Sequence, residues 1–339
     1  MLPQQIKKVA LKALLALVCA LIVWELILEN TNTLKPGAVN HPVLGRIYQP
    51  GLLVNGTEGY SRTHFNSLGM RGSAIGDKVP GEQRFLILGD SFTEAVQVSD
   101  EQMYATVIER LLSAESGQPV RAINGGRSNA SPAYYLHLAN YYQTTLKPDR
   151  VVIQLNDGDF IKDLLDTKLP FYVARTSDGF ETRSNYQSVS FPALRPLLEL
   201  SISRVAFLNL KGMFAKGERP EGEIPQAKPG FDYAPLVNWT IQELKARYQR
   251  PILLYIPFIN YLEAEQRPSE IEVLVTEAAK SAGLDFVNMR TDFLDRYRTT
   301  WDVPTGFNNT KPGMGHMNSV GHELVARRLA PLLSEGNIK

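Results

Sequence analysis

The sequence predicts an α/β domain in which strands and helices alternate around a parallel sheet. Short apolar runs such as 84–88 and 151–155 are typical of strands that are buried on both faces. Segments with helical spacing follow these runs, as in a doubly wound fold. The 339-residue chain is long enough for one large domain with an ample core.

The expected elements follow one another in a regular order. Strands are predicted at 84–88, 120–123, 151–155, 251–257 and 285–287, and helices at 102–114, 132–146, 237–248, 271–282 and 319–333. This alternation fails between about 162 and 231. A hairpin is expected there at 171–184, around Ser177-Asp178-Gly179, followed by a charged loop rich in Pro and Gly at 216–229. We interpret 162–231 as an insertion over one edge of the domain, a lid or substrate platform.

An apolar run near the N-terminus predicts a membrane anchor. Residues 9–28 would form a helix of roughly 30 Å, about the thickness of the hydrocarbon core of a bilayer. Lys7, Lys8 and Lys12 lie at its start, whereas Glu25 and Glu29 lie at its end. The positive-inside rule therefore predicts a cytoplasmic tail at 1–8, an anchor at 9–29 in the inner membrane, and a periplasmic or otherwise extracytoplasmic remainder.

Other interpretations of this run stay open but are less favoured. A cleaved signal peptide would need a site of small residues, and none follows the run. A lipoprotein anchor at Cys19 is disfavoured by bulky Leu17 and Val18 before it, and a buried soluble helix has nothing upstream to cover it. Residues 30–80, rich in Gly, Pro, Asn and Ser, are expected to be a stalk that wraps onto the domain at 81–335.

Composition argues against two other classes of function. A net charge of +1, without a basic stretch in the domain, does not favour a nucleic-acid partner. Cys19 is the only cysteine, so neither an intrachain disulfide nor a multi-thiol metal site is available.

Polar residues follow three of the predicted strands, at the edge of the sheet where ligands gather in such folds. After the first comes GDSFT at 89–93, in which Ser91 suits a nucleophile and Asp90 or Ser91 equally suits a helix N-cap. After the second comes NGGRSN at 124–129, which suits either close approach to a ligand or an ordinary turn.

The third strand end is LNDGD at 155–159. The amide of Asn156 can donate a hydrogen bond to an oxyanion. Asp157 and Asp159 raise the alternative of a metal site, although a solvated cap is the more common role of such a turn. No metal site is predicted.

His316 is the candidate general base. It lies between a Gly-rich turn and the last predicted helix, and a Ser hydroxyl needs a base with a pKa near neutrality. A surface histidine without a role is the alternative. His322, on the helix itself, is expected to serve packing or to cap a neighbouring loop.

In order and spacing these segments resemble the SGNH/GDSL hydrolase family. The matching stretches are GDSFT at 89–93, NGGRSNAS at 124–131, LND at 155–157 and HMNSVGHELVA at 316–326. An upstream NSLGMR at 66–71 resembles a lead-in found in extracytoplasmic members from polysaccharide gene neighbourhoods. The resemblance covers roughly 60–335 and implies a flavodoxin-like three-layer α/β/α sandwich, with no cofactor.

The resemblance also implies roles for individual residues. Ser91 would be the nucleophile and His316 its base. An oxyanion hole would be formed by the backbone N–H of Ser91, by Asn129, and by the side chain of Asn156. Asp90 and Gly126 would have supporting roles.

Two positions depart from the family pattern. Asn129 stands where the family has Gly, although a backbone N–H survives and Asn tolerates left-handed geometry. The family's Asp before the His is replaced here by Gly313 and Met314, which leaves either a Ser–His dyad or an acid from elsewhere, for which we name Asp302.

The expected function is therefore that of a serine-dependent esterase or acyltransferase. Its substrate would be an acylated polysaccharide or other ester, with acetyl groups of an envelope glycan first, and polysaccharide-assembly proteins are potential partners. One alternative is a non-catalytic glycan-binding or scaffold protein on a decayed hydrolase fold. The other is a lipid esterase, although the insertion is not notably apolar.

Overall fold

A computed structural model describes residues 4–31, 33–185, 200–214, 229–261 and 267–335. Five parallel strands form its central sheet: β5 (Gln83–Gly89), β6 (Val120–Gly126), β7 (Arg150–Leu155), β10 (Ile252–Tyr255) and β11 (Asp285–Asn288). Their spatial order is β6-β5-β7-β10-β11, which is the flavodoxin-like order 2-1-3-4-5. The predicted fold class is confirmed.

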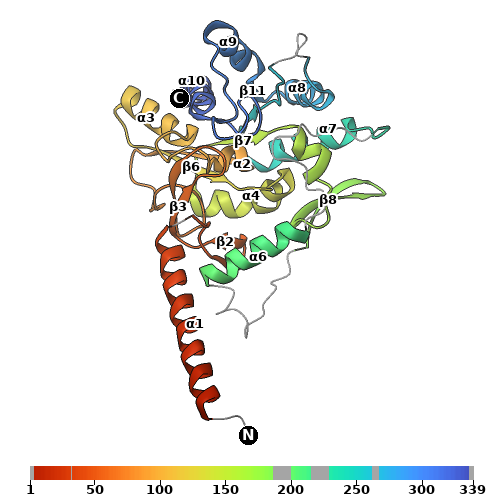
Figure 1. The fold of residues 1–339 in the computed structure, drawn as a ribbon. Coiled ribbons are helices and arrows are strands. Elements are labelled where there is room, and N and C mark those ends of the chain that lie inside the picture. The colour runs from red at the N-terminus through yellow and green to blue at the C-terminus, as the bar shows by residue number, and fades with distance from the viewer. Residues whose placement is uncertain (1–3, 32, 186–199, 215–228, 262–266, 336–339) are drawn as a thin grey trace.

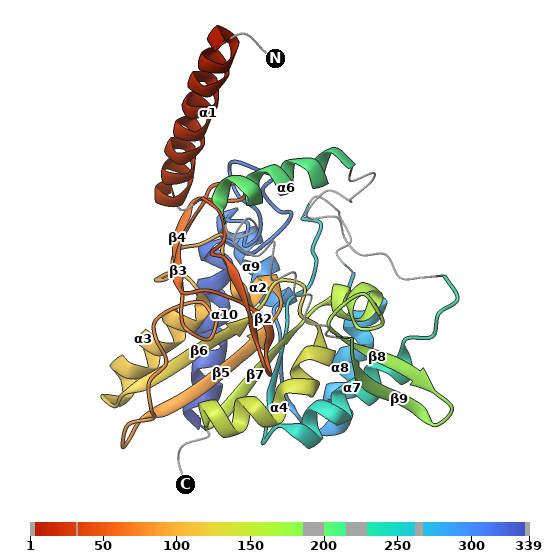
Figure 2. The same cartoon turned by 90° about the horizontal axis from the view of Figure 1, so that it is seen from below.

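Helices cover both faces of the sheet, as Figures 1 and 2 show. One face packs against α4 (Pro132–Leu146), α7 (Ala234–Arg247) and α8 (Glu270–Ala282). The other packs against α3 (Tyr104–Ser116), α9 (Arg290–Thr300) and α10 (Ser319–Glu335). Alternate residues of β5 supply both cores, since Leu86 and Leu88 lie in the first and Phe85 and Ile87 in the second.

Some elements differ from those predicted. Strand β6 runs on to Gly126 because Gly125 and Gly126 pair with the end of β5. Helix α9 was not expected, because it buries only Phe293 and Leu294 and the rest of its sequence is polar. Two short helical segments, α2 (Ser91–Glu94) and η1 (Asp159–Asp163), begin within a few residues of the ends of β5 and β7.

The insertion is only partly described. Strands β8 (Phe171–Thr176) and β9 (Gly179–Ser184) form the expected hairpin, and α6 (Ser201–Phe214) follows. The predicted loop at 216–229 lies outside the described residues, except for its last residue.

The N-terminal helix α1 (Gln4–Thr31) is long and apolar enough to cross a membrane, a property that a signal sequence shares. It projects away from the domain in Figures 1 and 2.

Between α1 and the sheet, the chain forms two antiparallel pairs. These are β1 (Ala38–His41) with β2 (Gly45–Tyr48), and β3 (Gly51–Asn55) with β4 (Ser61–Phe65). Arg71, just after the second pair, bridges to Asn124 on the edge strand β6. The segment predicted as a stalk therefore includes two hairpins, and its later part is joined to the edge of the domain.

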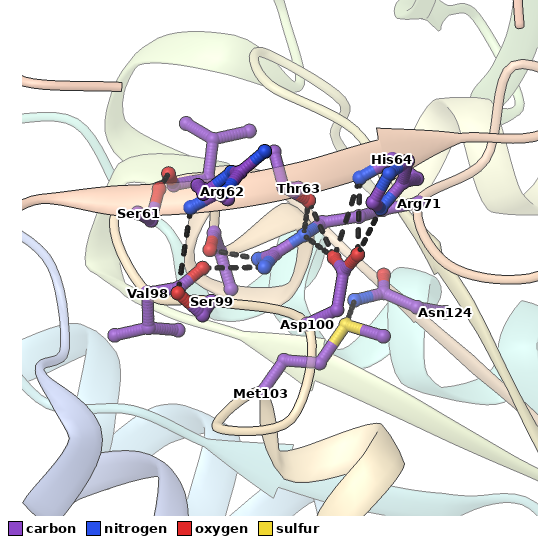
Figure 3. Close-up of polar contacts among 12 residues, drawn as sticks. Ser61, Arg62, Thr63, His64, Arg71, Val98, Ser99, Asp100, Met103 and Asn124 are labelled. Atoms are coloured by element: carbon purple, nitrogen blue, oxygen red, sulfur yellow. Dashed lines mark hydrogen bonds and ion pairs between the residues drawn. The ribbon is translucent and has the colours of Figure 1, made fainter. Parts of the chain in front are cut away.

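A fully buried guanidinium fastens the β3–β4 hairpin to the loop after α2. Arg71 has a side chain exposure of 0% and pairs with Asp100 at 3.2 Å. Figure 3 shows Arg71 between Thr63 and Asp100. Its remaining N–H groups donate to the backbone oxygens of Glu94, Ala95 and Val98. Burial lowers the pKa of Arg71 to about 10, so it stays protonated at neutral pH.

Replacing Arg71 by Met should lower the free energy of unfolding by about 3–5 kcal/mol, because several buried acceptors lose their donor. The exposed Arg62 of strand β4 is the matched control, and Arg62→Met should stay within about 0.5 kcal/mol of wild type. Urea unfolding of the full chain in detergent, followed by intrinsic fluorescence, measures both. Equal effects of the two substitutions would contradict the structural role assigned to Arg71.

Candidate active site

Ser91 lies where β5 passes into helix α2, at the carboxyl end of the sheet. Asp90 caps the helix, and its Oδ1 accepts a hydrogen bond from the Phe92 N–H at 2.9 Å. Gly89 is required at this turn because a Cβ there would lie 1.9 Å from Thr93 Oγ1. The N-cap alternative and the nucleophile hypothesis are therefore compatible, since Asp90 makes the cap and leaves the Ser91 hydroxyl available.

His316 reaches Ser91 from the loop before α10. Its Nε2 lies 2.9 Å from Ser91 Oγ, which is hydrogen-bonding distance. The Phe92 ring lies beside the imidazole, with the ring centroids 5.2 Å apart. Two residues separated by 225 positions in the chain are thus brought into contact.

The other ring nitrogen of His316 contacts Glu58, in the turn between β3 and β4. His316 Nδ1 lies 2.6 Å from Glu58 Oε2, and the His316 backbone N–H donates to Glu58 Oε1 at 2.8 Å. The Glu58 side chain is 7% exposed and that of His316 19% exposed. Glu58, His316 and Ser91 therefore form one continuous hydrogen-bonded chain.

The turn carrying Glu58 is fixed from two sides. Asn309 accepts from the Gly59 N–H at 2.8 Å, and its amide donates to Gly56 O and Gly59 O, both at 3.1 Å. Gly315, next to His316, has φ +87°, and a Cβ there would lie 2.3 Å from Glu58 Oε1. The glycine beside the histidine thus makes room for the carboxylate.

Burial and hydrogen bonding act on Glu58 in opposite directions. Burial favours the neutral acid, whereas the hydrogen bonds and charge of His316 favour the carboxylate. The net result is that the pKa of Glu58 lies below its usual value. An ionised Glu58 can accept a hydrogen bond from Nδ1–H. The proton then stays on Nδ1, and the unprotonated Nε2 faces Ser91 as a base.

Asn156 lies at the end of β7, beside the cap of α2. Its Nδ2 donates to Asp90 Oδ2 at 2.8 Å, and its Oδ1 accepts from the Gly158 N–H at 2.7 Å. These two bonds fix which way the amide points. Burial raises the pKa of the Asp90 carboxyl. The second Nδ2–H of Asn156 and the N–H of Ser91, which has no acceptor within its own helix, are the donors that could serve an oxyanion.

Gly126 is the last residue of β6, and Asn129 lies in the connection from β6 to α4. Asn129 is left-handed, with φ 62°, the geometry expected where an Asn replaces Gly. Gly126 lies against α2, since a Cβ there would be 2.2 Å from the Glu94 backbone nitrogen. Gly126 therefore allows the β6 end and the Ser91 helix to touch.

Asp302 is not the acid bonded to His316, so our expectation for the acid was wrong. Its Oδ2 accepts from Arg296 and, at 3.0 Å, from Thr300 Oγ1. These partners, only six and two positions away, hold the carboxylate at the end of α9. Glu58 occupies the position beside Nδ1 instead.

The remaining polar candidates have structural partners. Asp157 accepts from Ser269, and Asp159 accepts from the Asn156 N–H at 2.8 Å. Within the described ranges, no group of three His, Cys, Asp or Glu side chains is placed to hold a metal ion. His322 is buried, which lowers its pKa to about 3, and its Nδ1 accepts from the Tyr104 N–H at the start of α3.

Glu58 was not predicted, because no motif in the neighbouring sequence distinguishes it. It lies in a turn that precedes the first strand of the sheet, in the segment interpreted as a stalk. Glu58 lies in the turn of a hairpin, where a side chain is ordinarily exposed. Its position in the sequence therefore gave no reason to expect a buried carboxylate.

Comparison with known proteins does not name a family for this chain. No family model matches the sequence, and no curated protein matches it. Among solved structures, the α/β hydrolase LAE5 from the metagenome of Lake Arreo is 16% identical, with a TM-score of 0.43 over 75% of this chain and 96% of its own. Two acetyl xylan esterases are also similar.

The first is Axe2 from Geobacillus stearothermophilus, with 17% identity and a TM-score of 0.40 over 76% of this chain and 95% of its own. The second is AlAXEase, with 14% identity and a TM-score of 0.42 over 74% of this chain and 98% of its own. Similarity at this level does not assign a function, so the assignment depends on the site itself.

The lowered pKa of Glu58 predicts a pH-dependent contribution to stability. An unfolded Glu titrates near its usual value of 4.5 and the folded Glu58 below it, so the stabilisation is complete above about pH 4.5 and is lost as the pH falls through the folded pKa. Wild type should therefore unfold less readily than Glu58→Gln at about pH 6, and the difference should shrink toward about pH 3. Urea titrations across this range measure it, and a constant difference would refute an ionised Glu58.

Proposed function

We propose that this protein is a serine esterase that works through an acyl-enzyme, with Ser91 as nucleophile, His316 as general base and Glu58 as the acid that orients it. The observation that carries the proposal is the hydrogen-bonded chain from Ser91 Oγ to Nε2 of His316 and from its Nδ1 to Glu58. Nucleophile, base and orienting carboxylate in this sequence are the requirements of nucleophilic acyl transfer.

In the first half of the reaction, Ser91 Oγ attacks the carbonyl carbon of the ester and His316 Nε2 takes the hydroxyl proton. The tetrahedral intermediate then expels the alcohol, which receives that proton from His316, and the acyl group stays on Ser91. In the second half, a water or a sugar hydroxyl loses its proton to Nε2 and attacks the carbonyl carbon of the acyl-serine. The second tetrahedral intermediate expels Ser91 Oγ, which takes that proton back from Nε2, and the free acid or the acylated sugar leaves. Glu58 stabilises the imidazolium that forms in both halves.

The developing oxyanion needs donors placed before the reaction begins. We assign this role to the N–H of Ser91, the second Nδ2–H of Asn156 and the N–H of Asn129. Asp90 supports it indirectly, because it caps the Ser91 helix and holds the Asn156 amide. Removal of one such donor typically costs about 10²–10³-fold in kcat.

The proposed substrates are O-acetyl groups of an exported or envelope polysaccharide. The support is the apolar helix α1, whose length suits an inner-membrane anchor, and the predicted orientation with the domain outside the cytoplasm. Hydrolysis and transfer share the acyl-enzyme, and the same residues serve both. No cofactor is needed for either step, and polysaccharide-assembly proteins are the partners we propose.

A non-catalytic glycan-binding protein was the main alternative. Its motivation was the missing acid before His316 and the replacement of Gly by Asn129. Glu58 beside His316 Nδ1 weakens the first reason, and the left-handed Asn129, which keeps its backbone N–H, weakens the second. A lipid esterase has less support, because the sequence of the insertion at 162–231 is not notably apolar. We therefore retain the polysaccharide esterase as the function that the geometry supports best.

Substitution of Ser91 by Ala should reduce acetate release from an acetylated polysaccharide by at least about 10³-fold, because it removes the hydroxyl that is bonded to His316. The full chain in detergent micelles is the appropriate sample. The exposed Ser67 provides the matched control, and Ser67→Ala should keep wild-type turnover. Retention of activity within tenfold by Ser91→Ala would refute the proposal.

A further inference from the structure

The first turn of helix α6 is bonded to a carboxylate of the apolar helix α1. Glu25 Oε1 accepts from the Ser201 N–H at 2.6 Å, and Glu25 Oε2 accepts from the Ile202 N–H at 2.8 Å. These are two of the N–H groups that a helix cannot satisfy within itself. A charge inside the predicted span 9–29 thus has its partner on a segment 176 positions away.

The same junction continues toward the active site. Arg204 of α6 donates to Lys35 O at 2.9 Å, and Lys35 Nζ pairs with Glu94 Oε2 at 2.9 Å. Glu94 is the last residue of the helix that begins with Ser91, and its side chain is only 2% exposed. The outer end of α1, the start of α6 and the Ser91 helix therefore form one connected set.

The contact at Glu25 limits how far α1 can enter a bilayer. Polar backbone at the start of α6 cannot lie in hydrocarbon facing lipid, so the hydrocarbon must end close to Trp24. This limit shifts the span from the predicted 9–29 to about 6–24, and its 19 residues would measure about 28 Å, close to the roughly 30 Å of a hydrocarbon core. Trp24 is 56% exposed and suits the interface, while Lys7, Lys8 and Lys12 can extend toward the opposite surface.

Helix α6 runs across the direction of α1, away from their junction, in both Figure 1 and Figure 2. If α1 crosses the membrane, α6 therefore follows the membrane surface. Its apolar residues are not all covered, since Leu210 is 53% exposed and Leu200, just before the helix, is 39% exposed. Ala206, four residues before Leu210 and so on the same side, is also exposed.

We propose that α6 is an interfacial helix whose Ala206–Leu210 side lies in the outer headgroup layer of the membrane that α1 spans. This inference rests on the anchor part of the proposed function, but not on the esterase chemistry. The occupant of the exposed side is the lipid surface, because α6 begins at the level where α1 leaves the hydrocarbon. Attachment through both α1 and α6 would hold the domain at a fixed height and orientation above the membrane. The Lys35–Glu94 ion pair would connect these two helices to the Ser91 helix.

The inference is tested with full-length protein reconstituted in phosphatidylcholine vesicles. Cys19 is the only cysteine, so a Cys19→Ser background allows one label per variant. An environment-sensitive fluorophore is attached to Leu210→Cys, and as a control to Trp301→Cys. Trp301 is 76% exposed and follows α9, which lies at the opposite end of the molecule from α1 in Figure 1.

The label at 210 should shift to shorter wavelength in vesicles, and a spin-labelled lipid with its nitroxide near the headgroup should quench it at least about twofold. The label at 301 should do neither. Similar behaviour at both positions, while the protein stays in the membrane after carbonate extraction, would overturn the interfacial helix alone. Release of the protein by carbonate would overturn the anchor as well, and neither result depends on esterase activity.

Discussion

The imidazole of His316 is the point on which this site depends, because it is bonded on both sides by residues far away in sequence. Ser91 lies on one ring nitrogen and Glu58 on the other, separated from His316 by 225 and 258 positions. Three elements must therefore meet to within hydrogen-bonding distance: the end of β5, the loop before α10 and the β3–β4 turn. A carboxylate bonded to Nδ1 favours an unprotonated Nε2 directed at the serine, so the chemistry that we propose requires all three elements.

Several surrounding residues allow these three elements to meet. Gly89 and Gly126 let the β5 and β6 ends touch the Ser91 helix, and Gly315 lets Glu58 approach His316. Arg71 fastens the hairpin that carries Glu58 to the loop after that helix, as Figure 3 shows for its contacts with Thr63 and Asp100. A buried guanidinium is costly unless its donors are used, which explains why three backbone oxygens are turned toward it.

The fold class and the residues Ser91, His316 and Asn156 could be predicted from the sequence, whereas the acid beside His316 could not, and the reason is physical. Buried parallel strands leave apolar runs, and polar residues at their carboxyl ends must share one edge of the sheet, which brought attention to Ser91 and Asn156. Glu58 could not be found this way, because a turn outside the sheet reaches the site only through tertiary contacts such as those of Asn309. Asp302, which we named as the acid, is instead bonded to Arg296 on the preceding helix. The hydrogen bonds between Glu25 and α6 could not be predicted either, since a charge near the end of an apolar run is typical of the end of a membrane span.

The identity of the acid beside His316 tests this account most directly. Purified Glu58→Gln and Asp302→Asn proteins would be compared with wild type by kcat/KM for hydrolysis of p-nitrophenyl acetate. We expect kcat/KM to fall by about 10²–10⁴-fold in Glu58→Gln, because the imidazole loses its orienting charge. In Asp302→Asn we expect kcat/KM to stay within about threefold of wild type. A loss in Asp302→Asn with unchanged Glu58→Gln would contradict the proposed chain of Glu58, His316 and Ser91.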